Sequence, residues 1–168
     1  MSRFRSLILP LALLLPAACE GQNEAAPPAR ADTVTVRSSD PDVRAAQALL
    51  EQGHPFRASQ RLTPVLADSA RRTPEALLVA AAAAAGWEGW TEVRRLLEGQ
   101  PWVDSLDDGR GRMLLTRAAL VVRDAPAALA HATAALHDAR NDAERGERLT
   151  LLARALDQLD MRDSAARS

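Results

Sequence analysis

The stretch "EALLVAAAAAAGWEGWTEVRRLLEG", residues 75–99, has the pattern of two helices joined by a tight turn. Its first half is almost entirely Leu, Val and Ala, and alanine is the strongest helix former. Gly86 lies just past this run, where a helix often ends, and a shorter helix follows the turn. Because small side chains let neighbouring backbones approach closely, we expect the alanine-rich helix to lie between other helices.

Helical signals continue on both sides of this hairpin. Pro41 and Pro74 occupy first-turn positions where proline is favoured, and Pro126 falls in the first turn of a later segment. Pro64 falls inside the second segment and predicts a kink or break there. The sequence predicts helices within residues 39–53, from about Pro55 onward, and within 72–86, 90–99, 109–123, 125–139 and 144–159, with an eighth beginning at Met161.

The turns within the predicted hairpins recur at near-equal steps. They fall at Gly53, Glu88, Asp124 and Asp160, which are 35, 36 and 36 residues apart. A small or apolar residue follows five positions after each turn, at Ala58, Val93, Leu129 and Ala165. A period of about 35 residues with two helices per unit is typical of a helical solenoid.

This pattern resembles tetratricopeptide-like repeats over residues 40–168. The resemblance implies an all-α fold, a right-handed α-solenoid of antiparallel helix hairpins. The usual tyrosine positions of that family are empty here, and its closing proline is absent from most units. An irregular helix bundle with chance spacing remains the alternative.

The N-terminal residues have the pattern of an export signal. Arg3 and Arg5 precede a short apolar run, Leu7 to Leu15, which is too short to cross a bilayer. Residues 1–18 resemble a bacterial lipoprotein leader, in which Cys19 becomes the lipid-modified first residue. Pro16 stands where that family usually has leucine. An ordinary signal cleaved after Ala18 and a buried free Cys19 remain alternatives.

Residues 19–39 contain two adjacent prolines, small residues and scattered charge, so we expect a flexible tether between membrane and folded body. Within it, "DTVTVR" alternates, but one short strand is not stable alone. The lipoprotein resemblance implies a bacterial cell-envelope protein that faces the periplasm. Glu20, a residue other than Asp after the cysteine, favours the outer membrane.

Composition limits the functional classes. The 21 basic residues are all arginine, the net charge is −1, and no stretch concentrates positive charge. Nucleic acid is therefore not an expected partner. Aromatic residues make up only 3%, so the core must be built mainly from Leu, Val and Ala.

The sequence has no recognisable catalytic, metal or cofactor motif. His54, His131 and His137 lack neighbours at metal-ligand spacing, and ordinary surface or groove histidines are expected. The segment "DSLDDG", residues 104–109, lacks the length and closing Glu of a calcium loop, which favours a solvated loop. "GRGR", residues 109–112, lacks the spacing and lysine of a phosphate-binding loop.

Three tryptophans form the candidate binding surface. Trp87 and Trp90 flank the central turn, and Trp102 lies in the longest connection. They could present a platform for sugar or peptide. Alternatively, they fill the gaps where hairpins meet, because an indole buries a large apolar area.

Two functions of different class remain. One is an envelope-tethered scaffold or adaptor, since solenoids present extended surfaces to protein or peptide partners. The other rests on a resemblance to the N-terminal superhelical region of soluble lytic murein transglycosylases, which curves around peptidoglycan strands. The Glu-Ser motif of that family is absent, so this chain alone is not expected to be an enzyme.

The last residues, "LDMRDSAARS" from Leu159 to Ser168, predict a turn at Asp160 and one turn of a further helix. The repeat domain is therefore expected to be incomplete at its C-terminus. A frayed tail on a complete solenoid is the alternative. The stripe of Leu149, Leu152, Leu156 and Leu159 is expected to be the buried face of its helix, packed on the helix that begins at Met161. Because so short a partner covers about two turns at most, we also expect part of the stripe to stay exposed and to favour self-association of the chain.

Overall fold

The computed structural model describes residues 35–137, 139 and 141–167, with side chains as far as Met161. Within those residues the chain is all-helical and has no strand, which confirms the all-α prediction there. The helices are α1 (Pro41–Glu51), α2 (Pro55–Ala67), α3 (Pro74–Gly86), α4 (Trp90–Leu97), α5 (Arg110–Val121), α6 (Ala125–His137) and α7 (Asp142–Arg167), with the 3₁₀ helix η1 (Leu106–Gly109) before α5.

Side-chain caps start several helices where the sequence places them. The Asp40 carboxylate accepts from the backbone N–H of Asp42 at 2.8 Å, and Pro41 follows it at the start of α1. Thr73 Oγ1 accepts from the N–H of Ala76 at 3.3 Å and caps α3. Each cap satisfies an amide that has no acceptor within its helix.

Three helix hairpins share the same turn, repeated at a fixed spacing. Gly53, Glu88 and Arg123 hold positive φ angles of 76°, 64° and 58°, and each lies 35 residues from the next. The amide after each of them donates to a carbonyl five residues back: His54 to Leu49, Gly89 to Ala84, and Asp124 to Ala119. This is the hydrogen bond of a Schellman cap, so the three turns reverse the chain in the same way.

The buried positions follow the same 35-residue spacing. Ala58, Val93 and Ala128 are fully buried in the helix after each turn. The third of these differs by one residue from the predicted Leu129, because the left-handed residue of that turn is Arg123 rather than Asp124. Ala46, Ala81 and Thr116 are likewise equivalent and fully buried in the helix before it.

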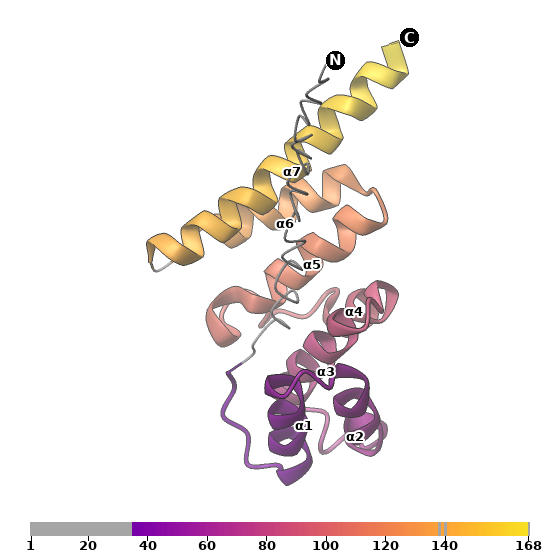
Figure 1. The fold of residues 1–168 in the computed structure, drawn as a ribbon, viewed down its shortest axis with the longest axis vertical. Helices are drawn as coiled ribbons and strands as arrows, with labels where there is room; N and C mark the ends of the chain where they lie inside the picture. The colour runs from indigo at the N-terminus through magenta and orange to yellow at the C-terminus, as the bar shows by residue number, and fades with distance from the viewer. Residues whose placement is uncertain (1–34, 138, 140, 168) are drawn as a thin grey trace, which may run out of the picture.

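Neighbouring helices pack along the whole chain, and Figure 1 shows them in order from α1 at one end to α7 at the other. In addition, α3 contacts both α1 and α5. All residues of α3 from Ala76 to Ala85 are buried, which confirms that the alanine-rich helix lies between others. Gly86, at the end of α3, packs directly against Pro55. A Cβ built on Gly86 would lie 2.5 Å from the Cβ of Pro55, so α2 and α3 meet this closely only with glycine at this position.

The segment before α1 belongs to the packed body. Val36 is buried in the core cluster that includes α1 and α3, and the Thr35 N–H donates to the carboxylate of Asp107 at 3.2 Å. In Figure 1 this indigo segment runs from α1 towards the connection before α5. Val36 therefore packs with the helical body, four residues before position 40, where the sequence predicts that the repeat domain starts.

The break that was one of two outcomes expected at Pro64 does not occur, and the helix end expected at Asp160 proves wrong. α2 continues through Pro64 to Ala67 without ending, and it buries Leu62 and Val65 on either side of the proline. α7 continues from Asp142 to Arg167, so the predicted turn at Asp160 and the separate eighth helix do not exist. Residues 159–163 contain no glycine, asparagine or proline to favour a left-handed or broken conformation, and the helix therefore propagates.

The predicted register of α7 is also wrong. Its inward face carries Arg148, Leu151 and Ala155, which are at most 4% exposed. The leucine stripe faces away from the core instead: Leu149 and Leu156 are exposed, and Leu152 and Leu159 are half-buried. No described helix is both long and apolar enough to cross a membrane.

Candidate functional site

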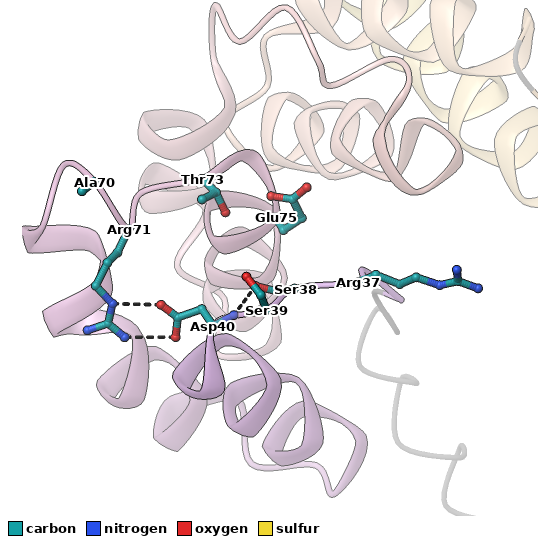
Figure 2. Close-up of a pocket in the computed structure, with 8 residues that line it drawn as sticks. All are labelled: Arg37, Ser38, Ser39, Asp40, Ala70, Arg71, Thr73 and Glu75. Atoms are coloured by element: carbon teal, nitrogen blue, oxygen red, sulfur yellow. Dashed lines mark hydrogen bonds and ion pairs between the residues drawn. The ribbon is translucent and has the colours of Figure 1, made fainter.

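A polar pocket of about 310 Å³ lies between the segment before α1 and the loop that joins α2 to α3 (Figure 2). Arg71 reaches from the loop to Asp40 and makes two hydrogen bonds to its carboxylate, at 2.8 and 3.0 Å. A third bond of 2.7 Å joins Arg71 to Asp42. In Figure 2 the side chain of Arg37 points away from this pair, and Glu75 stands at the opposite wall.

Two of the charged residues that line this pocket, Asp40 and Arg71, are paired with each other. The hydrogen bonds from Arg71 are the main cause that lowers the pKa of Asp40 to about 2, and the same pair raises the pKa of Arg71. Arg61 adds an ion pair to Asp42 at 2.7 Å. The Asp40–Arg71 pair therefore ties the start of α1 to the α2–α3 loop.

A second hollow has a different character. Two adjoining cavities of about 200 and 160 Å³ lie over α3 between α2 and α4, and both are lined by Leu66 and Leu96. We call them the α2/α4 groove. Its floor consists of Leu77, Ala80 and Ala84 of α3, its sides include Ser59, Thr63, Glu92 and Arg95, and Trp87, Arg72 and Gln100 complete its lining.

The groove exists because the floor residues are small. The alanine side chains of α3 are short, so they leave the space between α2 and α4 unfilled, and these two helices form the sides of the groove. Polar groups occur along the rim, where Arg95 binds the Glu92 carboxylate through two hydrogen bonds, at 2.7 and 2.5 Å. An apolar floor with a polar rim suits an apolar side chain on a peptide or a similar ligand.

Trp87 marks one end of this groove. Its indole is 41% exposed, and its Nε1–H donates to the Ser59 hydroxyl at 2.8 Å. The ring lies over Gly89: a Cβ built on that residue would be 2.2 Å from the ring. The Ser59 bond and the absent side chain at position 89 thus hold an exposed aromatic surface in one orientation.

The structure gives the three tryptophans different surroundings. Trp90 and Trp102 are partly buried and pack against the main core cluster, and Trp102 Nε1 donates to the side chain of Gln100 at 3.2 Å. Of the three, Trp87 is the one placed in the α2/α4 groove. The residues that sequence reasoning missed are Ser59 and Thr63, because their role depends on α2 facing α4. The alanine run was the available signal, since it implies a shallow floor.

The other polar residues considered in the sequence analysis bond to neighbouring parts of the protein. Arg112 pairs with Asp104 at 2.6 Å and contacts Nδ1 of His131 at 3.0 Å. Burial, followed by the nearby Arg112 charge, lowers the pKa of His131. Asp107 bonds Thr35, and no group of three metal-ligating side chains occurs among the described residues. Cys19 and the leader lie outside the part of the chain that the structure describes.

No family model, no curated protein and no solved structure matches this chain.

Proposed function

We propose that this protein is a helical-repeat scaffold whose α2/α4 groove binds a short apolar segment of a partner protein. The observation that carries this proposal is the groove itself, with an exposed, oriented Trp87 at its end and apolar residues along its floor. The three equivalent turns at 35-residue spacing support the solenoid interpretation, because stacked hairpins of equal length form a regular array.

The ligand class follows from the lining. Leu66, Leu77 and Leu96 offer apolar contact, while an aromatic face such as that of Trp87 stacks on aliphatic or aromatic side chains. The cavities are each large enough for one side chain, not for a folded domain. A short peptide with one apolar anchor beside Trp87 and a more polar neighbouring residue therefore fits better than a large flat surface.

The location proposed for this scaffold is the bacterial cell envelope. It rests on the lipoprotein-like leader and Cys19 in the sequence, with the helical body on the periplasmic side of the anchor. A protein partner at that surface would be an envelope or exported protein.

The test fills the groove without touching the core. Thr63 is exposed on the wall of α2, so Thr63→Trp should block the groove and leave folding intact. Gln60→Trp places the same indole on an exposed position of α2 that does not line it. A photo-reactive residue at Arg95, which is exposed on the rim of the groove, would capture the bound segment in cells, and the synthetic segment would then be titrated by fluorescence anisotropy.

We expect Thr63→Trp to weaken binding of that segment at least tenfold and Gln60→Trp to leave it unchanged. Equal affinity of the two variants would contradict the proposed site. Capture of glycan strands rather than a peptide would instead favour the alternative of a non-catalytic front region of a transglycosylase.

A further inference from the structure

The outward face of α7 is apolar and uncovered. Leu149 is 46% exposed and Leu156 is 48% exposed. The inward face of the same helix already packs on α5 and α6. Figure 1 places α7 at the end of the stack, with the other helices on one side of it. The helix therefore has a second apolar face with no covering element in the described part of the chain.

The spacing of this face is that of a coiled-coil seam. The leucines lie at 149, 152, 156 and 159, three, four and three residues apart. These are alternating a and d positions of a heptad, the arrangement that packs against a single partner helix. We call Leu149, Leu152, Leu156 and Leu159 the outer seam.

The outer seam is complementary to itself in the antiparallel direction. If a second α7 runs the opposite way about a two-fold axis at Arg154, Leu149 of each copy faces Leu159 of the other. In the same register Leu152 of one copy faces Leu156 of the other, so each of the four leucines contacts a leucine of the partner copy. Ala153, exposed and next to the axis, is small enough to let the two backbones approach.

The charges at the ends of the seam favour the same direction. Arg145 is exposed and lies four residues before Leu149, at the preceding d position of the seam. The antiparallel register brings it to the end of the partner helix that holds the exposed Asp160, and the sequence has a second aspartate at position 163. The two-fold axis repeats this pairing at the other end. A parallel pair would instead place Arg145 beside Arg145, which is repulsive.

We propose that two copies of this chain associate through the outer seams of their α7 helices, antiparallel about a two-fold axis at Arg154. The interface is isologous, so it closes at two copies and leaves no further seam exposed. Each dimer then carries two α2/α4 grooves, which goes beyond the binding function proposed for a single chain.

The first test measures association of the full chain carrying Cys19→Ser, by sedimentation velocity over a range of concentrations. We expect a monomer–dimer equilibrium. Leu156→Asp should raise the dissociation constant at least tenfold, because it places a carboxylate against Leu152 of the partner. Phe56→Asp is the matched control: Phe56 is 60% exposed but lies on α2, and the change should have no effect on association.

Charge reversal tests whether the two α7 helices pack in the antiparallel direction. Arg145→Asp should weaken the dimer, and adding Asp160→Arg and Asp163→Arg should restore it. Cross-linking with a short bismaleimide tests the register: a mixture of Leu149→Cys and Leu159→Cys chains should cross-link, and neither variant should do so alone. Circular dichroism of each variant verifies that the helices remain folded.

Three results would overturn the proposal. The chain could remain monomeric at every concentration, in which case another partner covers the seam. Leu156→Asp and Phe56→Asp could change association equally. Leu149→Cys could cross-link to itself, which would require a parallel pair.

Discussion

At the scale of single residues, Arg148 shows how much one polar side chain contributes to this helical stack. It is 1% exposed, yet it bears a charge. Its guanidinium donates to the backbone carbonyls of Ala135 at 2.6 Å and Asp108 at 2.5 Å. It therefore fastens α7 both to the end of α6 and to the connection before α5.

Replacement of Arg148 by Met should destabilise the protein by about 2 kcal/mol. Methionine fills much of the same volume, but two buried carbonyls lose their charged donor, and this loss outweighs the relief of burying a guanidinium. Urea denaturation followed by circular dichroism measures the change. Arg154→Met, at an exposed position of the same helix, should stay within about 0.5 kcal/mol of the parent. Equal losses in the two variants would contradict the role of Arg148.

Asp40 predicts a specific pH dependence of stability. Its pKa in the folded protein is about 2, against an ordinary value of 3.8, because Arg71 and backbone amides bind the charged form. A folded-state pKa below the unfolded value means that the carboxylate stabilises the fold fully above about pH 4. That contribution is lost as the pH falls towards 2.

The difference in unfolding midpoint between the parent and Asp40→Asn should thus be constant near neutral pH and shrink between about pH 4 and pH 2. Arg71→Met should remove most of the same pH dependence, since Arg71 is its main cause. A midpoint difference that stays constant down to pH 2 would be incompatible with this ion pair.

At the scale of elements, the three equivalent turns differ in one respect that affects their stability. The left-handed position is glycine in the first turn but Glu88 and Arg123 in the others. A side chain in the left-handed region costs about 1–2 kcal/mol, whereas glycine adopts it without that strain.

Glu88→Gly should therefore stabilise the protein by about 0.5–1 kcal/mol, after the greater freedom of glycine in the unfolded chain is subtracted. Gly53→Ala, at the equivalent position, should destabilise it by about 1 kcal/mol for the opposite reason. Denaturation midpoints of the two variants measure the expected gain in stability for Glu88→Gly and the expected loss for Gly53→Ala. A destabilising Glu88→Gly would show that the side chain of Glu88 makes a contact worth more than the backbone strain.

At the scale of the whole molecule, the proposed anchor at Cys19 decides where the grooves are displayed. A lipid-modified N-terminal cysteine carries enough acyl chains to hold a protein stably on a membrane, where a single chain would bind reversibly. The helical body would then extend from the membrane surface into the periplasm.

Cys19→Ser should release the protein from isolated membranes of an expressing bacterium, because the residue that accepts the lipid is gone. Fractionation after a high-salt wash, followed by immunoblotting, measures this release. The parent chain should remain with the membranes under the same wash. A serine variant that also remains there would contradict lipid anchoring.

Local patterns in the sequence determined most of the helices and their hairpin turns. Caps such as Asp40 and Thr73, the prolines after them and the 35-residue spacing depend on residues close in the chain, so they can be recognised without tertiary contacts. The central place of α3 was also predictable, because a helix of alanines has no large side chain to keep its neighbours apart.

Only the tertiary structure decided which face of α7 points inward and where that helix ends. Apolar residues occur on two faces of α7, and the buried face includes Arg148, although arginine side chains are mostly exposed in proteins. Hydrogen bonds to the carbonyls of Ala135 and Asp108 offset the cost of burying this arginine, and these residues lie 13 and 40 positions away in the sequence. The α2/α4 groove depends likewise on Ser59 and Trp87 meeting across 28 residues. Contacts at such separations leave no local pattern, and they are the ones that shape both proposed binding surfaces.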